Sequence, residues 1–416
     1  MSLVGSLFTG VSGLRTNSQA MNILGDNISN VNTVGFKASR AVFGDLFSTI
    51  LNNGATTSQV GRGTQFLGST QVFNQGSFET SSNSLDLAID GSGFFIVNNG
   101  TGNFYTRNGQ FRLNDNGQVQ LISGQILQGF RITNGVVGST LENVDLAGVQ
   151  SAPQATTNFT LGANLNGAAS AGTTFTSPIS IFNSSGAQVV MSITFTKVAA
   201  PGNDWRYSVT LPSGAGSVSA GASGTLNFGT NGQLTGVNGG AIVNPTITLD
   251  FSTANPPAAT QSLTWNLLQP GTTTTNGKMT AFAAPSNNNS IVQDGFPTGT
   301  LVGLGVNFDG VINGLFNNGQ SESLFQLALA DFLAPSGLTR QGQNLFAESG
   351  ESGQPIIATA NTGGFGSVLG QTLELSNVDL AAEFVSLITT QQAFQASARV
   401  ITTTDDLLTE TVNLTR

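Results

Sequence analysis

The chain has 416 residues, of which only 8% are charged, and it carries a net charge of -9. It contains no cysteine and no histidine, which excludes disulfides, thiol or imidazole catalysis and the usual zinc ligands. The negative net charge argues against nucleic-acid binding, which needs clustered lysines and arginines, and the chain has only three lysines, Lys37, Lys197 and Lys278. We therefore expect no cofactor, no metal and no nucleic-acid partner.

The first 30 residues are predicted to form a helix. Large apolar residues recur there at alternating spacings of three and four, which is typical of a coiled coil: Val4, Leu7, Val11, Leu14, Met21 and Ile28. Four glycines in the segment (Gly5, Gly10, Gly13 and Gly25) each cost roughly 1 kcal/mol relative to alanine, so we expect close helix approach there. The segment lacks the features of a cleaved secretory signal, and no apolar run reaches transmembrane length. We expect export without a cleaved signal and no membrane insertion.

Two β regions are predicted to follow, one nested in the other. Residues 31–78, together with 354–373, are expected to form an extended linker region. Residues 79–147 contain short runs in which apolar and polar residues alternate, and the runs are separated by turn sequences at Asp90-Gly91, Asn108-Gly109 and Asn116-Gly117. This pattern predicts an antiparallel meander.

Residues 148–295 form a predicted insertion. The composition shifts there to Thr, Ser, Gly and Pro, and Met191–Phe195 and Trp205–Leu211 alternate between apolar and polar residues. Hairpin patterns return in residues 296–353, with a turn predicted at Asn313-Gly314. We expect residues 79–147 and 296–353 to build an inner β domain, and residues 148–295 to form an outer β domain inserted into it.

The last 43 residues, 374–416, are predicted to form a second helix. Ser376, Asn377 and Asp379 provide side chains typical of a helix start. The apolar spacing is again that of a coiled coil: Leu380, Phe384, Leu387, Phe394, Ala398, Ile401, Leu408 and Val412. The β-branched run Val400–Thr404 weakens an isolated helix, so we predict that the termini become ordered only when copies assemble.

The fold class expected from these elements is mixed and mainly β. Two nested β domains, of hairpin, sandwich or barrel-like architecture, accompany a coiled-coil-like pair of N- and C-terminal helices.

Four motifs resemble those of the bacterial flagellar axial family, which comprises rod and hook proteins. NILGDNISNVNTVGFK, from Asn22 to Lys37, is similar to the family's N-terminal signature. SNVDLAAEFVSLITTQQAFQASARVITTTDDLLTETVNL, from Ser376 to Leu414, is similar to its C-terminal helix. Two interior stretches, Leu85–Phe111 and Leu327–Gly353, add to the resemblance. The signature residues carried over are Asn22, Asn27, Asn30, Asn32, Thr33, Gly35, Phe36 and Lys37.

The resemblance implies a structural subunit of the flagellar hook rather than an enzyme. Such a subunit passes through the flagellar type III export apparatus and polymerises, as a homopolymer, into a curved flexible tube that transmits torque from rod to filament. The implied partners are the hook cap, the distal rod and the hook-filament junction proteins, and the implied location is the extracellular hook and basal body. The inserted domain favours hook subunits over the shorter distal rod protein, which is the first alternative. A secreted β-rich adhesin or carbohydrate-active enzyme is an alternative of another class.

Other charged residues receive structural interpretations. We expect Arg15 to be solvated or channel-facing and Lys37 to be an ordinary linker cation. Asp86 and Asp90 flank a turn, Gly91 and Gly93 lack the lysine and helix of a phosphate loop, and Asp309 with Asn313 is too sparse for a calcium loop.

Overall fold

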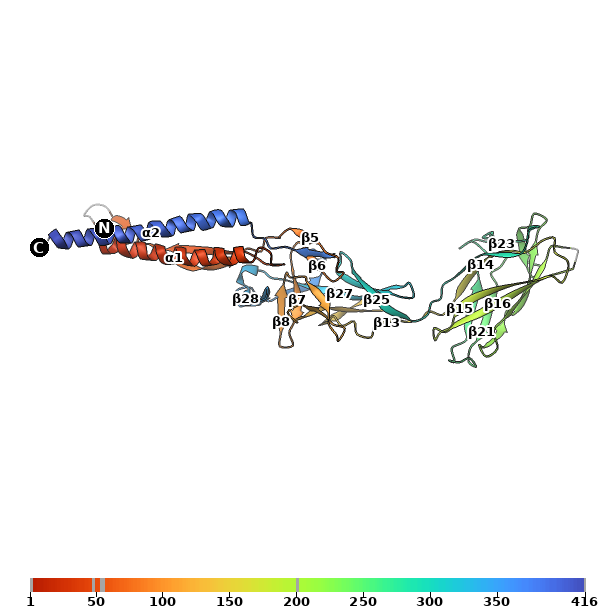
Figure 1. Cartoon of the computed structure of the whole chain (residues 1–416). Coiled ribbons are helices and arrows are strands. Elements are labelled where there is room, and N and C mark those ends of the chain that lie inside the picture. The colour runs from red at the N-terminus through yellow and green to blue at the C-terminus, as the bar shows by residue number, and fades with distance from the viewer. Residues whose placement is uncertain (1–2, 47–48, 53–56, 200–201, 415–416) are drawn as a thin grey trace. The chain divides into compact units, whose positions relative to one another are not determined.

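The computed structural model describes residues 3–46, 49–52, 57–199 and 202–414. Its contacts divide the chain into two compact units (Figure 1). Unit 1 comprises Met1–Gly148, Gly303–Gly314 and Glu322–Arg416, and unit 2 comprises Val149–Val302 with Leu315–Ser321. Unit 1 is therefore built from segments that precede and follow unit 2 along the chain. Two nested, mainly β regions flanked by terminal helices confirm the expected fold class, and the described residues form no closed barrel.

Two helices, α1 (Leu3–Ser29) and α2 (Leu380–Leu414), lie side by side in unit 1 (Figure 1). They are antiparallel, because Gly10 lies against Ile401 while Asn27 contacts Glu383. A Cβ atom added at Gly10 would lie 2.9 Å from Ile401 Cγ1, and one at Gly13 would lie 2.8 Å from Ser397 Oγ. Close helix approach is thus found at these two glycines. The same expectation is wrong for Gly25, which has no neighbouring atom within 4 Å.

Short strands make up the rest of unit 1. They are β1 (Ser39–Asp45), β2 (Thr49–Asn52), β3 (Thr57–Val60), β4 (Thr64–Gln71), β5 (Phe78–Thr80), β6 (Leu87–Asp90), β7 (Phe94–Asn98), β8 (Asn103–Thr106), β9 (Phe111–Leu113), β10 (Val119–Leu121), β11 (Ile126–Thr133) and β12 (Val136–Asn143), then β28 (Thr339–Gly342), β29 (Leu345–Ala347), β30 (Ile356–Thr359), β31 (Ser367–Gly370) and β32 (Thr372–Glu374), with a 3-10 turn at Pro335–Gly337. Three strands cross the boundary between the units in sequence: β25 (Gly299–Val306), β26 (Val311–Phe316) and β27 (Ser321–Asp331).

The predicted meander of unit 1 is only partly correct. Hairpins β7–β8 and β9–β10 form as expected. Strand β6, however, pairs with β31, and β8 pairs with β29. Strands from the C-terminal half of the chain thus pair at positions where a meander would have strands adjacent in sequence. The turn predicted at Asn313-Gly314 is also wrong, because both residues lie within β26, and the chain turns at Asn307–Gly310 instead.

Unit 2 is a sandwich of two sheets. One sheet has the order β18-β21-β22-β14-β23, with β24 also on β14, and the other has the order β15-β16-β17-β19-β20. The strands of the sandwich are β14 (Asn158–Asn164), β15 (Thr174–Phe182), β16 (Gln188–Lys197), β17 (Trp205–Thr210), β18 (Ser217–Ala220), β19 (Ser223–Phe228), β20 (Leu234–Val237), β21 (Thr246–Asp250), β22 (Gln261–Trp265), β23 (Met279–Thr280) and β24 (Asn287–Gln293). Strand β13 (Gln150–Ser151) lies outside the sandwich and pairs with β25. The alternating runs predicted at Met191–Phe195 and Trp205–Leu211 are confirmed as β16 and β17, which pair antiparallel and alternate in burial.

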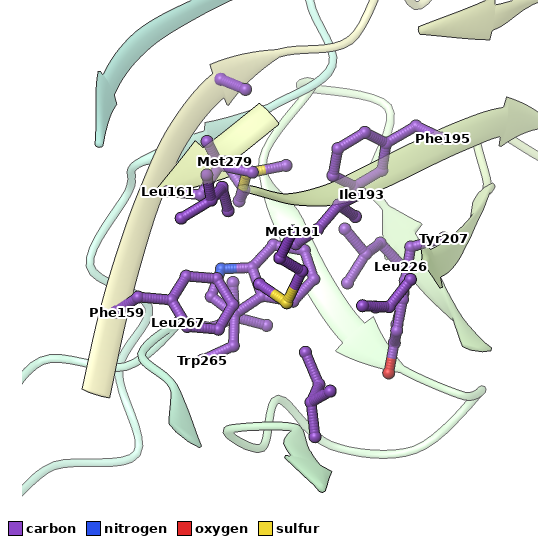
Figure 2. Packing of buried hydrophobic residues seen from close by; sticks show 14 of the residues in the cluster. Phe159, Leu161, Met191, Ile193, Phe195, Tyr207, Leu226, Trp265, Leu267 and Met279 are labelled. Atoms are coloured by element: carbon purple, nitrogen blue, oxygen red, sulfur yellow. The ribbon is translucent and has the colours of Figure 1, made fainter. Parts of the chain in front are cut away.

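The core of unit 2 lies between these two sheets. Figure 2 shows Phe159 and Trp265 from one sheet packed with Met191, Phe195 and Tyr207 from the other. The Trp265 ring lies 5.8 Å from that of Phe159 and 5.4 Å from that of Tyr207, measured between centroids. Both tryptophans of the chain, Trp205 and Trp265, are fully buried here. Tryptophan fluorescence therefore reports on unit 2 alone.

The described helices include none with the length and apolar character needed to cross a membrane.

Candidate assembly site

The signature segment and the chain entering α2 meet in unit 1 around one buried carboxylate. Glu374 Oε1 lies 2.6 Å from Lys37 Nζ, and Glu374 Oε2 lies 3.2 Å from Arg107 Nη1. The Lys37 and Glu374 side chains are fully buried. We call Lys37, Arg107 and Glu374 the buried ion cluster. It joins residues from the two ends of the sequence to one from the hairpins between them.

Backbone groups complete the coordination of the buried ion cluster. Lys37 Nζ also donates to the carbonyl of Asn74 at 2.8 Å, and the Gly76 amide donates to Glu374 Oε1 at 3.0 Å. Arg107 donates to the carbonyls of Ile89 and Gly91. Burial lowers the pKa of Lys37, and the Glu374 carboxylate opposes that shift. Because each charge has opposite-charge and backbone partners, the cluster meets the condition under which buried charges are tolerated.

Two asparagines fix the backbone on either side of the buried ion cluster. Asn27, at the end of α1, accepts from the Ser39 amide at 2.9 Å and donates to the Ser39 carbonyl at 2.8 Å. Asn377 accepts from the Ala38 amide and donates to the carbonyls of Val72 and Asn74. Both side chains thus supply hydrogen bonds to backbone groups that would need partners when removed from water.

Four further signature residues support this local structure. Asn30 donates to Asp26 and accepts from the Thr33 hydroxyl at 3.1 Å. Gly35 has φ 69°, and a Cβ there would lie 2.6 Å from Arg107 backbone atoms, so no other residue fits without a shift. The Gly35 amide donates to the Glu374 carbonyl at 2.8 Å. Phe36 is buried, with the Arg340 guanidinium 5.3 Å from its ring centroid. Asn22 and Asn32 are exposed and lie outside this network.

The interpretation of Lys37 as an ordinary linker cation is wrong, because its ammonium is fully buried and paired. Arg107 and Glu374 were missed as site residues. The sequence does carry one signal for them: with 8% charged residues, each charge in an otherwise apolar stretch is unusual. Which charges meet, however, depends on long-range pairing such as that of β32, which ends at Glu374, with β5, and no local pattern predicts it.

Of the three predicted helix-start residues, only Asp379 caps the helix itself, while Ser376 and Asn377 bind backbone groups before it. Asp379 caps α2, with its Oδ1 accepting from the Ala381 amide at 2.9 Å and from that of Ala382 at 3.3 Å. Asn377 holds the neighbouring backbone instead, and Ser376 Oγ accepts from the Val378 amide within the approach to the helix.

The first turn of α2 also contacts α1. Glu383 Oε1 accepts from Asn27 at 3.3 Å, while its Oε2 is buried without a hydrogen-bond partner among the described residues. Burial raises the pKa of Glu383, and the nearby Asp379 charge adds to the rise, while the Asn27 hydrogen bond opposes it.

The apolar residues of the helices form two separate sets. An inner set is half-buried between α1 and α2: Leu7, Leu14, Met21, Ile28, Leu387, Phe394, Ala398, Ile401 and Leu408. An outer set is exposed: Val4, Phe8, Val11, Leu380, Phe384, Val385, Ile388, Val400, Leu407 and Val412. The outer set includes five of the predicted coiled-coil residues, namely Val4, Val11, Leu380, Phe384 and Val412. A single chain therefore leaves large apolar side chains exposed to solvent on both helices.

The remaining candidate residues have structural surroundings. Asp86 accepts from the Ser81 hydroxyl and the Asn83 amide. Arg15 is exposed on α1. Within the described ranges, acidic residues nowhere gather into a group able to hold a metal ion.

Four family models match the chain. They are described as flagella basal body rod protein (residues 7–37), flagellar hook protein FlgE/F/G D1 domain (88–166), flagellar basal body protein FlaE D2 domain (150–296) and flagellar basal body rod FlgEFG protein C-terminal (369–414). Flagellar hook protein FlgE of Treponema pallidum is 32% identical, with 100% of both chains covered. That of Borreliella burgdorferi is 33% identical, covering 99% of this chain and 100% of the relative.

The chain belongs to the flagellar hook protein FlgE family. This hook-family chain is also similar to a crystal structure of Helicobacter pylori flagellar hook protein FlgE2, at 13% identity and a TM-score of 0.44, covering 71% of this chain and 100% of that one. Membership confirms the resemblance to the flagellar axial family and assigns the chain to the proteins of the flagellar hook and basal body. The family also implies polymerisation within the flagellar axial structure.

Proposed function

We propose that the chain is the structural subunit of a flagellar hook, which polymerises into a curved, flexible tube and transmits torque from rod to filament. The observation that carries this proposal is the exposed outer set on both helices. Phe8 and Val385 are each 62% exposed, and Leu407 is 56% exposed. Exposed apolar surface is unfavourable by about 25 cal/mol per Å², and many large apolar side chains exposed on two neighbouring helices mark a surface that another chain covers.

The chemistry of the chain supports a structural role over an enzymatic one. Nucleophilic catalysis by a Ser-His or Cys-His pair requires residues that the sequence lacks. In the buried ion cluster each charged side chain is paired with an opposite charge, and the Lys37 and Glu374 side chains are fully buried, so the cluster is not an open substrate site. We propose the hook cap, distal rod and hook-filament junction proteins as its neighbours, and export through the flagellar type III apparatus without a cleaved signal.

Electron microscopy of the concentrated, purified chain tests the proposal. We expect short tubes from the full chain and none from a variant lacking residues 1–30 and 374–416. Normal tubes from the truncated variant would contradict the role assigned to the helices. Failure of the full chain to form tubes under any condition that supports a known hook protein would contradict the proposed function.

The distal rod protein is the alternative within the same family. A deletion strain separates the two functions. Loss of a hook subunit leaves a complete basal body, whereas loss of a distal rod subunit arrests assembly before the outer rings form. A complete basal body in the deletion strain is the outcome we expect.

A further inference from the structure

A groove of about 720 Å³ lies in unit 1 between the outer face of α1 and the turn leading into β4. Phe8, Val11 and Arg15 line it from α1, at the three- and four-residue spacing that places them on one helix face. Arg62 and Phe66 line it from the other side. Gly63 allows the two walls to approach closely, because a Cβ there would lie 2.2 Å from Ser12 Oγ. The groove is therefore a built feature that combines apolar walls with two cations.

The groove is positively charged. Arg15 and Arg62 are the charged side chains among the described residues that line it, and none of those residues is acidic. Neither arginine forms an ion pair with any residue that the structure describes. In a chain with only 13 lysines and arginines, two unpaired arginines at one apolar groove indicate an acidic, partly apolar occupant.

The C-terminal turns of α2 have the matching character. Asp406 and Glu410 lie one helical turn apart on one face, with Leu407, 56% exposed, beside them. The three acids of this segment, which include Asp405, are all exposed, and none forms an ion pair with a described residue. The inner face of the same turns, at Ile401 and Leu408, is half-buried between the helices.

A chain cannot fill its own groove with these turns. Gly10 is level with Ile401, and the helices are antiparallel. Arg15 lies five residues from Gly10 in one direction along the helix pair, and Asp406 lies five residues from Ile401 in the other. At 1.5 Å per residue the two side chains are separated by about 15 Å along the axis. Pairing between them therefore requires a second copy.

We propose that the groove of one subunit receives the last turns of α2 from a second copy of the chain. Asp406 and Glu410 pair with Arg15 and Arg62, and Leu407 packs against the apolar wall formed by Phe8, Val11 and Phe66. The inference rests on the proposed function and adds to it a defined contact between subunits.

Charge reversal on each side of the contact tests the proposal. One variant carries Arg15→Glu and Arg62→Glu, and the other carries Asp406→Arg and Glu410→Arg. Each variant alone is expected to form at least 10-fold less tube than the unmodified chain at equal concentration. An equimolar mixture of the two is expected to regain tube formation. In the mixture, the acidic groove of the first variant can bind the basic helix of the second, and the basic groove of the second can bind the acidic helix of the first. Each favourable contact then joins two different molecules.

A matched control carries Arg112→Glu and Arg206→Glu, two exposed arginines outside the groove. It changes the net charge as the groove variant does, and it is expected to assemble normally. Circular dichroism and tryptophan fluorescence check that every variant folds. Normal tubes from either single-sided variant, or no recovery in the mixture, would overturn the inferred contact. If the unmodified chain itself forms no tubes, the proposed function fails instead, so the two failures are distinguishable.

Discussion

Glu374 is the residue on which the two ends of the polypeptide converge. Its carboxylate holds Lys37 from the N-terminal signature and Arg107 from the hairpins, and its backbone carbonyl accepts from Gly35. Desolvation of three charges is costly, and only their mutual attraction and the surrounding carbonyls offset it. The arrangement therefore fixes one conformation more strongly than it adds net stability.

Glu374→Gln is expected to destabilise this region by about 3 to 5 kcal/mol, because it leaves two buried cations without a countercharge. The amide keeps the size of the side chain, so the loss is electrostatic. Hydrogen exchange of peptides covering Gly35–Lys37 and Gly76 measures it, with exchange expected to accelerate roughly 100-fold or more. Tryptophan emission should not change, since both tryptophans lie in unit 2.

Glu142→Gln is the matched control. Glu142 pairs with Arg131 at 3.5 Å, but both side chains are 47% exposed. Pairs of this kind contribute about 0 to 1 kcal/mol, so local exchange should change little. Equal effects of the two substitutions would show that burial of the Glu374 cluster has no energetic consequence.

At the scale of elements, α1 is a helix whose glycines serve different purposes. Gly10 and Gly13 allow α2 to approach, whereas Gly25 faces open space. Removing a glycine normally stabilises a helix by about 1 kcal/mol. The structure predicts that this gain is reversed where a side chain would displace Ile401.

Gly10→Leu and Gly25→Leu form a matched pair that tests this difference. At Gly10 the new side chain must separate the helices, at a cost of about 1 to 3 kcal/mol that exceeds the helix-propensity gain. At Gly25 only the gain remains. The critical concentration for tube assembly is expected to rise about 10-fold for Gly10→Leu, which corresponds to 1.4 kcal/mol, and not to rise for Gly25→Leu. Similar values for the two variants would contradict the close packing of α1 on α2.

At the scale of the whole molecule, periodicity predicted the helices and hairpins but not their partners. The three- and four-residue spacing locates α1 and α2, because it reflects a face that must be covered. The spacing cannot separate Leu7 and Leu14, which are half-buried, from Val4 and Val11, which are exposed. Likewise the Asn116-Gly117 turn predicts hairpin β9–β10, but the pairing of β6 with β31 joins strands far apart in sequence. Long-range pairing is decided by the sum of many contacts, which no local pattern contains.

The order of the chain ends is expected to depend on assembly. In one molecule, α1 and α2 bury only their inner set, and a side chain such as Phe8 or Leu407 gains about 1.5 to 3 kcal/mol only when another copy covers it. The glycines of α1 and the β-branched run Val400–Thr404 further weaken the isolated pair. Strands β16 and β17 serve as the internal reference, because their buried residues need no second molecule.

Hydrogen exchange of the same preparation before and after polymerisation measures this dependence. In monomers the amides of α1 and α2 should exchange much faster than those of β16 and β17, and in tubes the two groups should become comparably protected. Helix amides already protected in the monomer would contradict the expectation, since they would show that the inner set alone overcomes the conformational entropy of both helices. Slow exchange of the α1 and α2 amides in tubes alone is the expected result. It would mean that these helices become stable only in contact with neighbouring subunits.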